Sequence, residues 1–270
     1  IAVLVTEPLS ELFGDPTYSE FLSGITEELS ESSYLPVILQ ASSTHERNRA
    51  REHFERRSFD AVIDVSPYKG SELLEVLREL SVPTVLCGQL EGHPYRDVFS
   101  TVYSDDEEGG HFAALAMKER GRKDIVAVLG PQDNPAVIDR LRGYRAVLGK
   151  DLPDENVVYT GWNSGDGYQA MHQLLAREIT FDGVLCGSGR IATGVITALN
   201  EAGLSVPADV SVVGFDDHEI AARYVPALTT VRQPLREEGH MAASIALDMI
   251  KGAEPTTTVM HMQLIQRDSL

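Results

Sequence analysis

The sequence predicts an α/β fold of two lobes, each a mostly parallel sheet with helices on both faces. Short apolar runs alternate with amphipathic segments along the whole chain, which is typical of repeated strand and helix units. The roughly ten strands that this rhythm predicts exceed the needs of one ordinary doubly wound sheet. The 270 residues, of which 43% are hydrophobic, are sufficient for two compact cores.

Continuous apolar runs predict strands that are buried on both faces, as parallel strands are. In the first part of the chain they lie at 1–5, 35–41, 59–65 and 83–87. Helical spacing between them predicts helices at 18–29, after Ser43 and at 71–80. Ser43 and Glu46 form a capping-box pattern, in which each side chain hydrogen-bonds the other residue's backbone at a helix start.

The same alternation continues after residue 100. Predicted strands lie at 125–129, 157–160, 183–186 and 210–215, and predicted helices at 107–120, 137–148, 168–176 and 192–199. A last long helix is expected to begin at Pro234, which fits a first helical turn, and to end at Gly252.

The charge and composition exclude several classes of function. A formal net charge of −18 repels the phosphate backbone, so this chain is not expected to grip DNA by itself. No apolar stretch is long enough to span a bilayer, and no signal peptide is expected because Ile1 already opens a strand-like run. Cys87 and Cys186 are expected to be buried thiols, which suits a reducing, cytoplasmic location.

Several segments in shared order resemble the effector-binding core of the lactose-repressor/galactose-repressor (LacI/GalR) family of bacterial transcription regulators. The strongest is Val206-Pro207-Ala208-Asp209-Val210-Ser211-Val212-Val213-Gly214-Phe215-Asp216-Asp217, followed by Pro226-Ala227-Leu228-Thr229-Thr230-Val231-Arg232-Gln233-Pro234. The others are Arg140-Leu141-Arg142-Gly143-Tyr144, Phe59-Asp60-Ala61-Val62-Ile63, and Gly167-Tyr168 after Trp162. The similarity runs from Ile1 to about Arg267.

The resemblance implies a two-lobed, periplasmic-binding-protein-like fold with three crossings between the lobes, near 102–104, 230–232 and 259–261. The N-terminal lobe would then combine 1–102 with 231–258, and the C-terminal lobe 103–230 with 259–270. It also implies a regulator of repressor type, in which a small-molecule effector between the lobes changes operator affinity through its different affinity for two lobe arrangements.

The family's helix-turn-helix headpiece and hinge are absent from this chain, and we expect that they have been removed from it. Operator DNA would be contacted through that headpiece, by a homodimer whose first lobes pair. The helix at 71–80 is the candidate dimer face, although its pattern equally suits an ordinary helix covering the sheet. A tetramer remains open.

In sheets of this kind, ligands bind beyond the carboxyl ends of the strands. Trp162, Asp216 and Arg140 stand at such places, where relatives stack an aromatic ring, bind effector with a carboxylate and place an arginine. The alternatives are a core wedge for Trp162, a helix cap for Asp216 and a surface ion pair with Asp139 or Asp133 for Arg140. Other positions that match the family's cleft are Tyr18, Ser66, Gln89, Asp105, Asn134 and Ser188.

Two departures leave the effector open among sugars, nucleobases and phosphorylated metabolites. Many relatives carry an arginine at Ile138 and an Asn-Asp pair at Ser188-Gly189, which hydrogen-bond sugar hydroxyls, so their loss argues against a typical sugar clamp. Backbone amides after Ser188, together with Arg190, could instead hold an anionic group of the effector.

Two alternative functions are enzyme and transport protein. Gly187-Ser188-Gly189-Arg190-Ile191-Ala192 has the form of a dinucleotide fingerprint, but it lies late in the chain and no acidic residue closes the next strand. No catalytic set stands out, and consecutive Asp217, His218 and Glu219 rarely converge on one metal ion, so we expect no enzyme, cofactor or metal. An extracytoplasmic solute-binding protein of a transporter shares the architecture and would be monomeric.

Overall fold

The chain divides into two compact units. The computed structural model describes residues 1–65, 67, 71–90, 92, 94–177 and 179–270. Unit 1 consists of Ile1–Ser104 and Pro234–Met260, and unit 2 of Asp105–Gln233 and His261–Leu270. The chain therefore passes from one unit to the other after Ser104, after Gln233 and after Met260.

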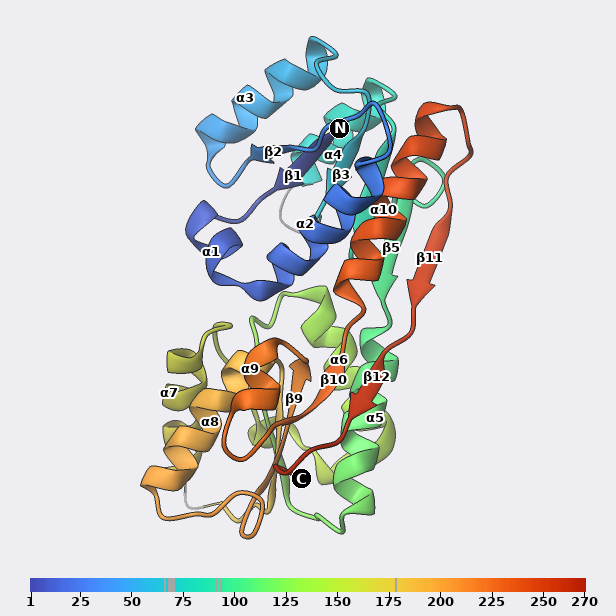
Figure 1. Cartoon of the computed structure of the whole chain (residues 1–270). Helices are drawn as coiled ribbons and strands as arrows, with labels where there is room; N and C mark the ends of the chain where they lie inside the picture. Colours follow the sequence, from blue (N-terminus) through green and yellow to red (C-terminus); the bar gives the residue numbers. More distant parts are fainter. Residues whose placement is uncertain (66, 68–70, 91, 93, 178) are drawn as a thin grey trace. The chain divides into compact units, whose positions relative to one another are not determined.

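Unit 1 is a six-stranded parallel sheet in the order β11-β5-β4-β3-β1-β2 (Figure 1). Its strands are β1 (Ala2–Val5), β2 (Val37–Gln40), β3 (Val62–Asp64), β4 (Thr84–Cys87), β5 (Ser100–Ser104) and β11 (Thr257–Met260). Its helices are α1 (Leu9–Gly14), α2 (Pro16–Leu29), α3 (Thr44–Glu55), α4 (Ser71–Glu79) and α10 (Leu235–Ile250).

Unit 2 contains a second six-stranded sheet in the order β12-β10-β9-β8-β6-β7, in which only the β10–β12 pair is antiparallel. Its strands are β6 (Ile125–Leu129), β7 (Val157–Tyr159), β8 (Gly183–Cys186), β9 (Ser211–Asp216), β10 (Thr229–Arg232) and β12 (Gln263–Ile265). Its helices are α5 (Asp106–Glu119), α6 (Pro135–Leu148), α7 (Ser164–Leu175), α8 (Gly189–Glu201) and α9 (Glu219–Arg223), with short 3-10 turns at Gly149–Asp151 and Asp154–Asn156. The predicted fold class is confirmed.

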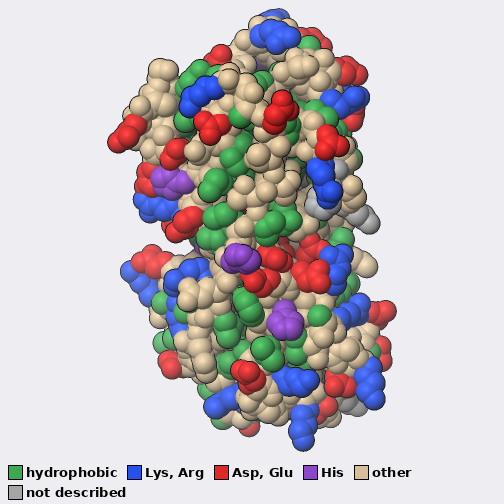
Figure 2. All heavy atoms as spheres, turned by 90° about the vertical axis from the view of Figure 1, so that its right-hand side faces the viewer, with side chains coloured by type: hydrophobic (Ala, Val, Ile, Leu, Met, Phe, Trp, Pro, Cys, Tyr) green, Lys and Arg blue, Asp and Glu red, His purple; other side chains and the backbone are tan. Residues whose placement is uncertain are grey.

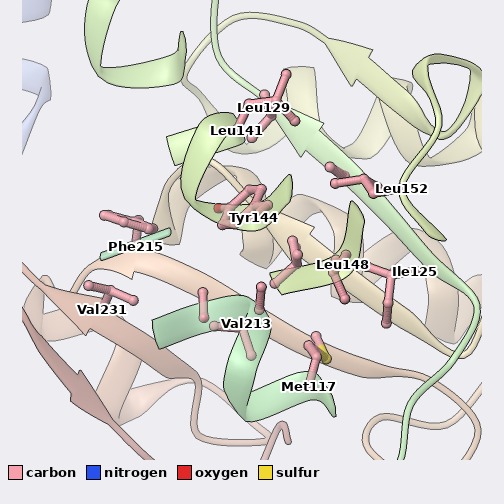
Figure 3. Close-up of a cluster of buried hydrophobic side chains, with 14 of the residues drawn as sticks. Met117, Ile125, Leu129, Leu141, Tyr144, Leu148, Leu152, Val213, Phe215 and Val231 are labelled. Atoms are coloured by element: carbon pink, nitrogen blue, oxygen red, sulfur yellow. The ribbon is translucent and has the colours of Figure 1, made fainter. Parts of the chain in front are cut away.

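Successive side chains of the central strands enter opposite cores, because side chains alternate across a strand. On β6, Ile125, Ala127 and Leu129 pack with α5 and α6, whereas Val126 and Val128 pack with α7 and α8. Figure 3 shows the first of these cores, with Tyr144 of α6 pointing into it beside Phe215 of β9. The continuous apolar runs of the sequence are therefore strands buried on both faces.

The helix that we predicted as a dimer face has no exposed apolar surface. Leu73, Leu74 and Leu77 of α4 are buried in the core of unit 1, and the described solvent-facing side chains of the helix are charged. The covering of the sheet accounts for its amphipathic pattern, and a dimer face on this helix and its neighbours stays a prediction. The large exposed apolar residues of this unit include Leu35, Val37 and Ile38, on or next to the edge strand β2.

Local sequence signals identify the ends of several helices. Ser43 and Glu46 form the predicted capping box of α3, and Gly252 adopts a left-handed φ of +95° directly after the turn that ends α10. Both cysteines are buried free thiols, as expected. Helices α1 and α9 were not predicted, since six and five residues are too few to show helical periodicity.

Acidic, basic and apolar side chains are interspersed over the face shown in Figure 2. Within the described part of the chain, no helix has the length and apolar character needed to cross a membrane.

Among the described residues, three pairs of neighbouring helices approach backbone to backbone, and in each pair both helices supply a glycine. A Cβ atom on Gly24 of α2 would lie 2.0 Å from the carbonyl oxygen of Arg236, and one on Gly239 of α10 would lie 2.2 Å from that of Phe21. The same reciprocal arrangement joins α5 to α6 through Gly110 and Gly143, and α7 to α8 through Gly167 and Gly194. Any side chain at these positions would push the two helices apart.

Replacing one of these glycines should destabilise the fold, although Gly→Ala inside a helix ordinarily stabilises by up to about 1 kcal/mol. In Gly194→Ala the new methyl would lie 1.9 Å from the carbonyl oxygen of Ser164. We expect a loss of at least about 1–3 kcal/mol in the free energy of unfolding, measured from the urea midpoint. Gly14→Ala, where a Cβ meets nothing within 4 Å, is the control; equal stability of the two variants would contradict the close contact.

Candidate functional site at the carboxyl ends of the unit 2 strands

The candidate site lies where β6, β8 and β9 of unit 2 end, at Leu129, Cys186 and Asp216. These strands are parallel neighbours, so their carboxyl ends meet at one edge of the sheet. The segments that follow them begin with Gly130, Gly187 and Asp217. Two of the three are glycines, which leaves room for side chains from other elements to approach the strand ends.

Arg140 of α6 is the centre of the site, and it is only 4% exposed. Its Nε donates a hydrogen bond of 2.7 Å to Asp106 Oδ1 of α5, and its Nη1 donates to the carbonyl oxygen of Gly187 after β8. Nη1 also lies 3.6 Å from Asp216 Oδ1. The guanidinium carbon stands 3.9 Å from the ring centroid of Phe215, a cation–π contact. Arg140 is thus a buried ion-pair residue and not a surface arginine paired with Asp139 or Asp133.

Two carboxylates therefore face one guanidinium. Burial raises the pKa of Asp106 to about 6, and the Arg140 charge and hydrogen bond act in the opposite direction. Asp216 accepts a hydrogen bond of 2.6 Å from Gln233 Nε2, and its Oδ2 lies 3.9 Å from His218 Nε2. Asp216 does not cap α9, because the N-cap position of this helix is occupied by His218.

The backbone after β9 is strained at two consecutive aspartates. Asp216 and Asp217 have φ values of +81° and +57°, in the left-handed region that ordinary residues seldom occupy. Asp217 is held there by two arginines, with Arg232 Nε at 2.8 Å from Oδ2 and Arg267 Nη1 at 2.7 Å from Oδ1. Such strain persists where surrounding contacts fix it, and it is frequent at ligand sites.

Trp162 follows β7, the edge strand that pairs with β6. A Cβ built on Gly130 would lie 2.5–2.6 Å from three atoms of its six-membered ring, so the indole packs directly on this glycine. Gly187, in turn, packs on the backbone of Leu129 and Gly130, and its carbonyl oxygen accepts from Arg140. A continuous chain of contacts therefore links the tryptophan ring to the guanidinium. Trp162 also borders both cores of unit 2 while staying partly exposed, so it is part core wedge and part surface ring.

Three predicted site residues are helix caps. The side chains of Asp105, Asn134 and Ser188 accept hydrogen bonds from the backbone amides of Glu108, Ala136 and Ile191, at the starts of α5, α6 and α8. Ser188 is only 2% exposed, and its hydroxyl oxygen accepts the Ile191 amide. The structure therefore gives these three side chains a local structural role beside the predicted one.

The remaining predicted residues belong to the sequence range of unit 1. Tyr18 is in the first turn of α2 and Gln89 follows β4; both are half-buried. Ser66 lies outside the described residues. Ile138, at the position where many relatives carry an arginine, is 41% exposed on α6.

Sequence reasoning missed Asp106, Gln233, Gly130 and Gly187. Asp106 could have been found as the second of four consecutive acidic residues after β5, and Gln233 belongs to a segment already noted for its resemblance. The two glycines follow strands directly, which is a signal for close approach of another group. In the described parts of the chain, no three His, Cys, Asp or Glu side chains are arranged to hold a metal ion.

Comparison of the sequence with known proteins identifies the family of this chain. The sequence profile of the periplasmic binding protein-like domain matches residues 114–270. The HTH-type transcriptional regulator CelR of Thermobifida fusca is 32% identical to the whole chain, which covers 80% of that protein. The chain belongs to the LacI/GalR family of transcriptional regulators.

Other relatives agree with this assignment. The ribose operon repressor of Escherichia coli K12 is 29% identical over 93% of this LacI-family chain and 76% of its own length. The solved CelR–cellobiose complex superimposes with a TM-score of 0.94 at 32% identity, covering all of this chain and 84% of that one. A ribose-bound LacI-family regulator from Enterococcus faecium gives a TM-score of 0.83 at 25% identity, covering 99% and 97%.

This LacI-family chain is the ligand-binding core of a transcriptional regulator. The relatives are regulators, which disfavours the alternative of a transport-associated solute-binding protein.

The raised pKa of Asp106 predicts a specific pH dependence. When the pH lies between the pKa of an aspartate in the unfolded chain and about 6, Asp106 holds a proton in the folded protein that it has released in the unfolded chain. The stability contribution of Asp106 is therefore greatest in acid, falls as the pH rises through this window by at most about 3 kcal/mol, and is constant above it.

Urea unfolding of the wild type and Asp106→Asn between pH 4 and pH 8 tests this. The wild type should lose stability relative to the variant as the pH rises to about 6, with no further change above. Glu107→Gln, which changes an exposed neighbouring carboxylate, is the control. The difference in stability between the wild type and this variant should show no such trend with pH. Parallel curves for wild type and Asp106→Asn would contradict the assignment.

Proposed function

We propose that the strand-end site of unit 2 binds an uncharged, polyhydroxylated effector, a carbohydrate, and that its occupancy changes the affinity of the regulator for operator DNA. The observation that carries this proposal is the Arg140 guanidinium, flanked by two carboxylates, and linked through Gly187 and Gly130 to a partly exposed tryptophan. Carboxylates accept hydrogen bonds from sugar hydroxyls, and a flat aromatic ring packs against the apolar face of a sugar.

The charge balance disfavours an anionic effector. Asp106 and Asp216 together outweigh the single positive charge of Arg140, so a phosphate or carboxylate here would meet a net negative environment. The amide of Ile191 already donates to Ser188 Oγ, which removes one backbone donor that an anion at the start of α8 could use. Phosphorylated metabolites are therefore less suitable than neutral sugars.

Two findings on similar proteins agree with this ligand class. CelR has been solved with cellobiose and the Enterococcus faecium regulator with ribose. The missing arginine at Ile138 and the missing Asn-Asp pair indicate that the hydroxyl contacts differ from those of typical sugar-binding relatives, so the particular sugar is set by other residues.

The effector acts, in this proposal, through a binding equilibrium and not through a reaction. A ligand shifts a conformational equilibrium only by as much as its affinities for the two states differ. DNA contact requires a positively charged element in addition to this chain, because the chain itself carries a formal net charge of −18. We assign this action to a cytoplasmic homodimer.

A ligand screen tests the effector class. Cellobiose, ribose, a nucleobase, glucose and glucose 6-phosphate are compared by thermal shift and titration calorimetry. A neutral sugar should raise the melting temperature, and its phosphorylated form should bind at least about tenfold more weakly, or about 1.4 kcal/mol. Preference for glucose 6-phosphate over glucose, or for the nucleobase alone, would overturn the proposed class.

The residues are tested with the sugar that binds most tightly in that screen. Trp162→Leu and Asp216→Asn should each weaken binding at least about tenfold. Tyr159→Leu removes another partly exposed aromatic residue of the same sheet, at its edge strand β7, and should bind as the wild type does. Equal losses for Trp162→Leu and Tyr159→Leu would place the ligand elsewhere.

The homodimer is tested at the exposed edge of unit 1. Val37 and Ile38 are 45% and 42% exposed on β2, which pairs with β1 on one side only and is an edge strand of the kind that can pair with another chain. We expect a dimer by sedimentation velocity for the wild type and a shift toward monomer for Ile38→Lys. Val259→Lys on β11, the opposite edge strand, is the matched control. A wild type that is monomeric at high concentration would refute the dimer.

A further inference from the structure

The Trp162 ring packs closely on the backbone of Gly130, and we call this contact the seat of the ring. A Cβ on Gly130 would lie 2.5, 2.5 and 2.6 Å from Cη2, Cζ2 and Cζ3 of the indole. Three consecutive ring atoms can be equally distant from one point only if that point lies over the ring and not beyond its edge. The indole therefore rests on Gly130 by its face.

We propose that Gly130 is a positioning residue that sets how deeply the Trp162 ring sits, and thereby the space left above the ring for the effector. The role of the ring as a platform rests on the proposed function; its seating on Gly130 does not. Nothing larger than hydrogen fits between the two, since real Cβ contacts are not found below 3.0 Å. Gly130 thus acts through Trp162 and need not touch the ligand.

The backbone of Gly130 is held on both sides and has little freedom to yield. On one side, the amide of Thr160 donates to the carbonyl oxygen of Leu129 at 2.9 Å. On the other side, the amide of Gly187 donates to Val128 at 2.8 Å, and a Cβ on Gly187 would lie 3.0 Å from the nitrogen of Gly130. An added methyl group must therefore move the indole.

The indole can move, because Trp162 is partly exposed. Carbon atoms in optimal contact are about 3.5–4.0 Å apart, so a methyl at Gly130 would lift the ring by roughly 1 Å. A shift of that size exceeds the tolerance of about 0.5 Å within which binding groups usually work. A ligand lying on the ring would move with it relative to the strand ends of the sheet.

Gly130→Ala tests the seat without any ligand, because Trp162 is the only tryptophan of the chain. The variant should change the emission maximum of the protein and raise the quenching of its fluorescence by acrylamide. Gly14→Ala, where a Cβ meets open space, should leave both unchanged. Identical spectra and quenching for wild type and Gly130→Ala would overturn the proposal.

Cellobiose and ribose titrations then test the consequence for binding. Gly130→Ala should bind the sugar that the wild type binds at least about tenfold more weakly. Equal affinity for wild type and Gly130→Ala would overturn the positioning role while leaving the proposed function intact. If the wild type binds neither sugar but the fluorescence changes, the seat stands and the choice of these sugars as effectors fails.

A double variant separates seating from general damage. Phenylalanine lacks the outer ring of the indole, which contains the three atoms that contact Gly130. Trp162→Phe should therefore lower the melting temperature of the wild type. Introduced into Gly130→Ala, it should instead recover part of the melting temperature that this variant has lost. Additive effects of the two substitutions would contradict direct contact. This readout also applies if Gly130→Ala alone is too unstable for titration.

Discussion

The backbone-to-backbone contact between α5 and α6 is the constraint on which the candidate site depends. A Cβ on Gly110 would lie 2.3 Å from the carbonyl oxygen of Arg140, and one on Gly143 would lie 2.1 Å from that of Glu107. The residues that pack on these glycines are thus Arg140 itself and the neighbour of Asp106. The close spacing of α5 and α6 therefore fixes the ion pair between Asp106 and Arg140. A larger distance between the helices would separate the two charges while leaving both of them buried.

The charges of the site follow from the same geometry. Arg140 is buried but has Asp106, Asp216 and the carbonyl oxygen of Gly187 around it, so its positive charge is more than compensated before any ligand arrives. Asp216 reaches the guanidinium from a strained turn that Gln233 and the neighbouring Asp217 contacts hold in place. The result is a set of hydrogen-bond acceptors held by several contacts, which in the proposed function suits a neutral ligand better than an anion.

The layered fold could be predicted because buried parallel strands and amphipathic helices leave periodic patterns. The site could be predicted only in part. Trp162, Arg140 and Asp216 came from the resemblance, but the partner of Arg140 is 34 residues away on α5 and depends on tertiary packing, whereas sequence proximity pointed to Asp139. The three helix caps could be predicted from the neighbouring sequence, because each capping side chain stands two or three residues before the amide that it accepts from: Asp105, Asn134 and Ser188. The contact of Trp162 with Gly130 required the pairing of β6 with β7.

The reciprocal glycines of the three helix pairs also bear on how the protein can diverge. Where main chains touch, the distance between helices no longer depends on which side chains fill the interface. The outward faces of these helices can then accumulate substitutions, or accept dye labels and immobilisation tags, without transmitting a change of spacing to the sheet beneath. A scaffold with this property tolerates extensive surface drift, which is consistent with a TM-score of 0.94 to a solved relative at 32% identity.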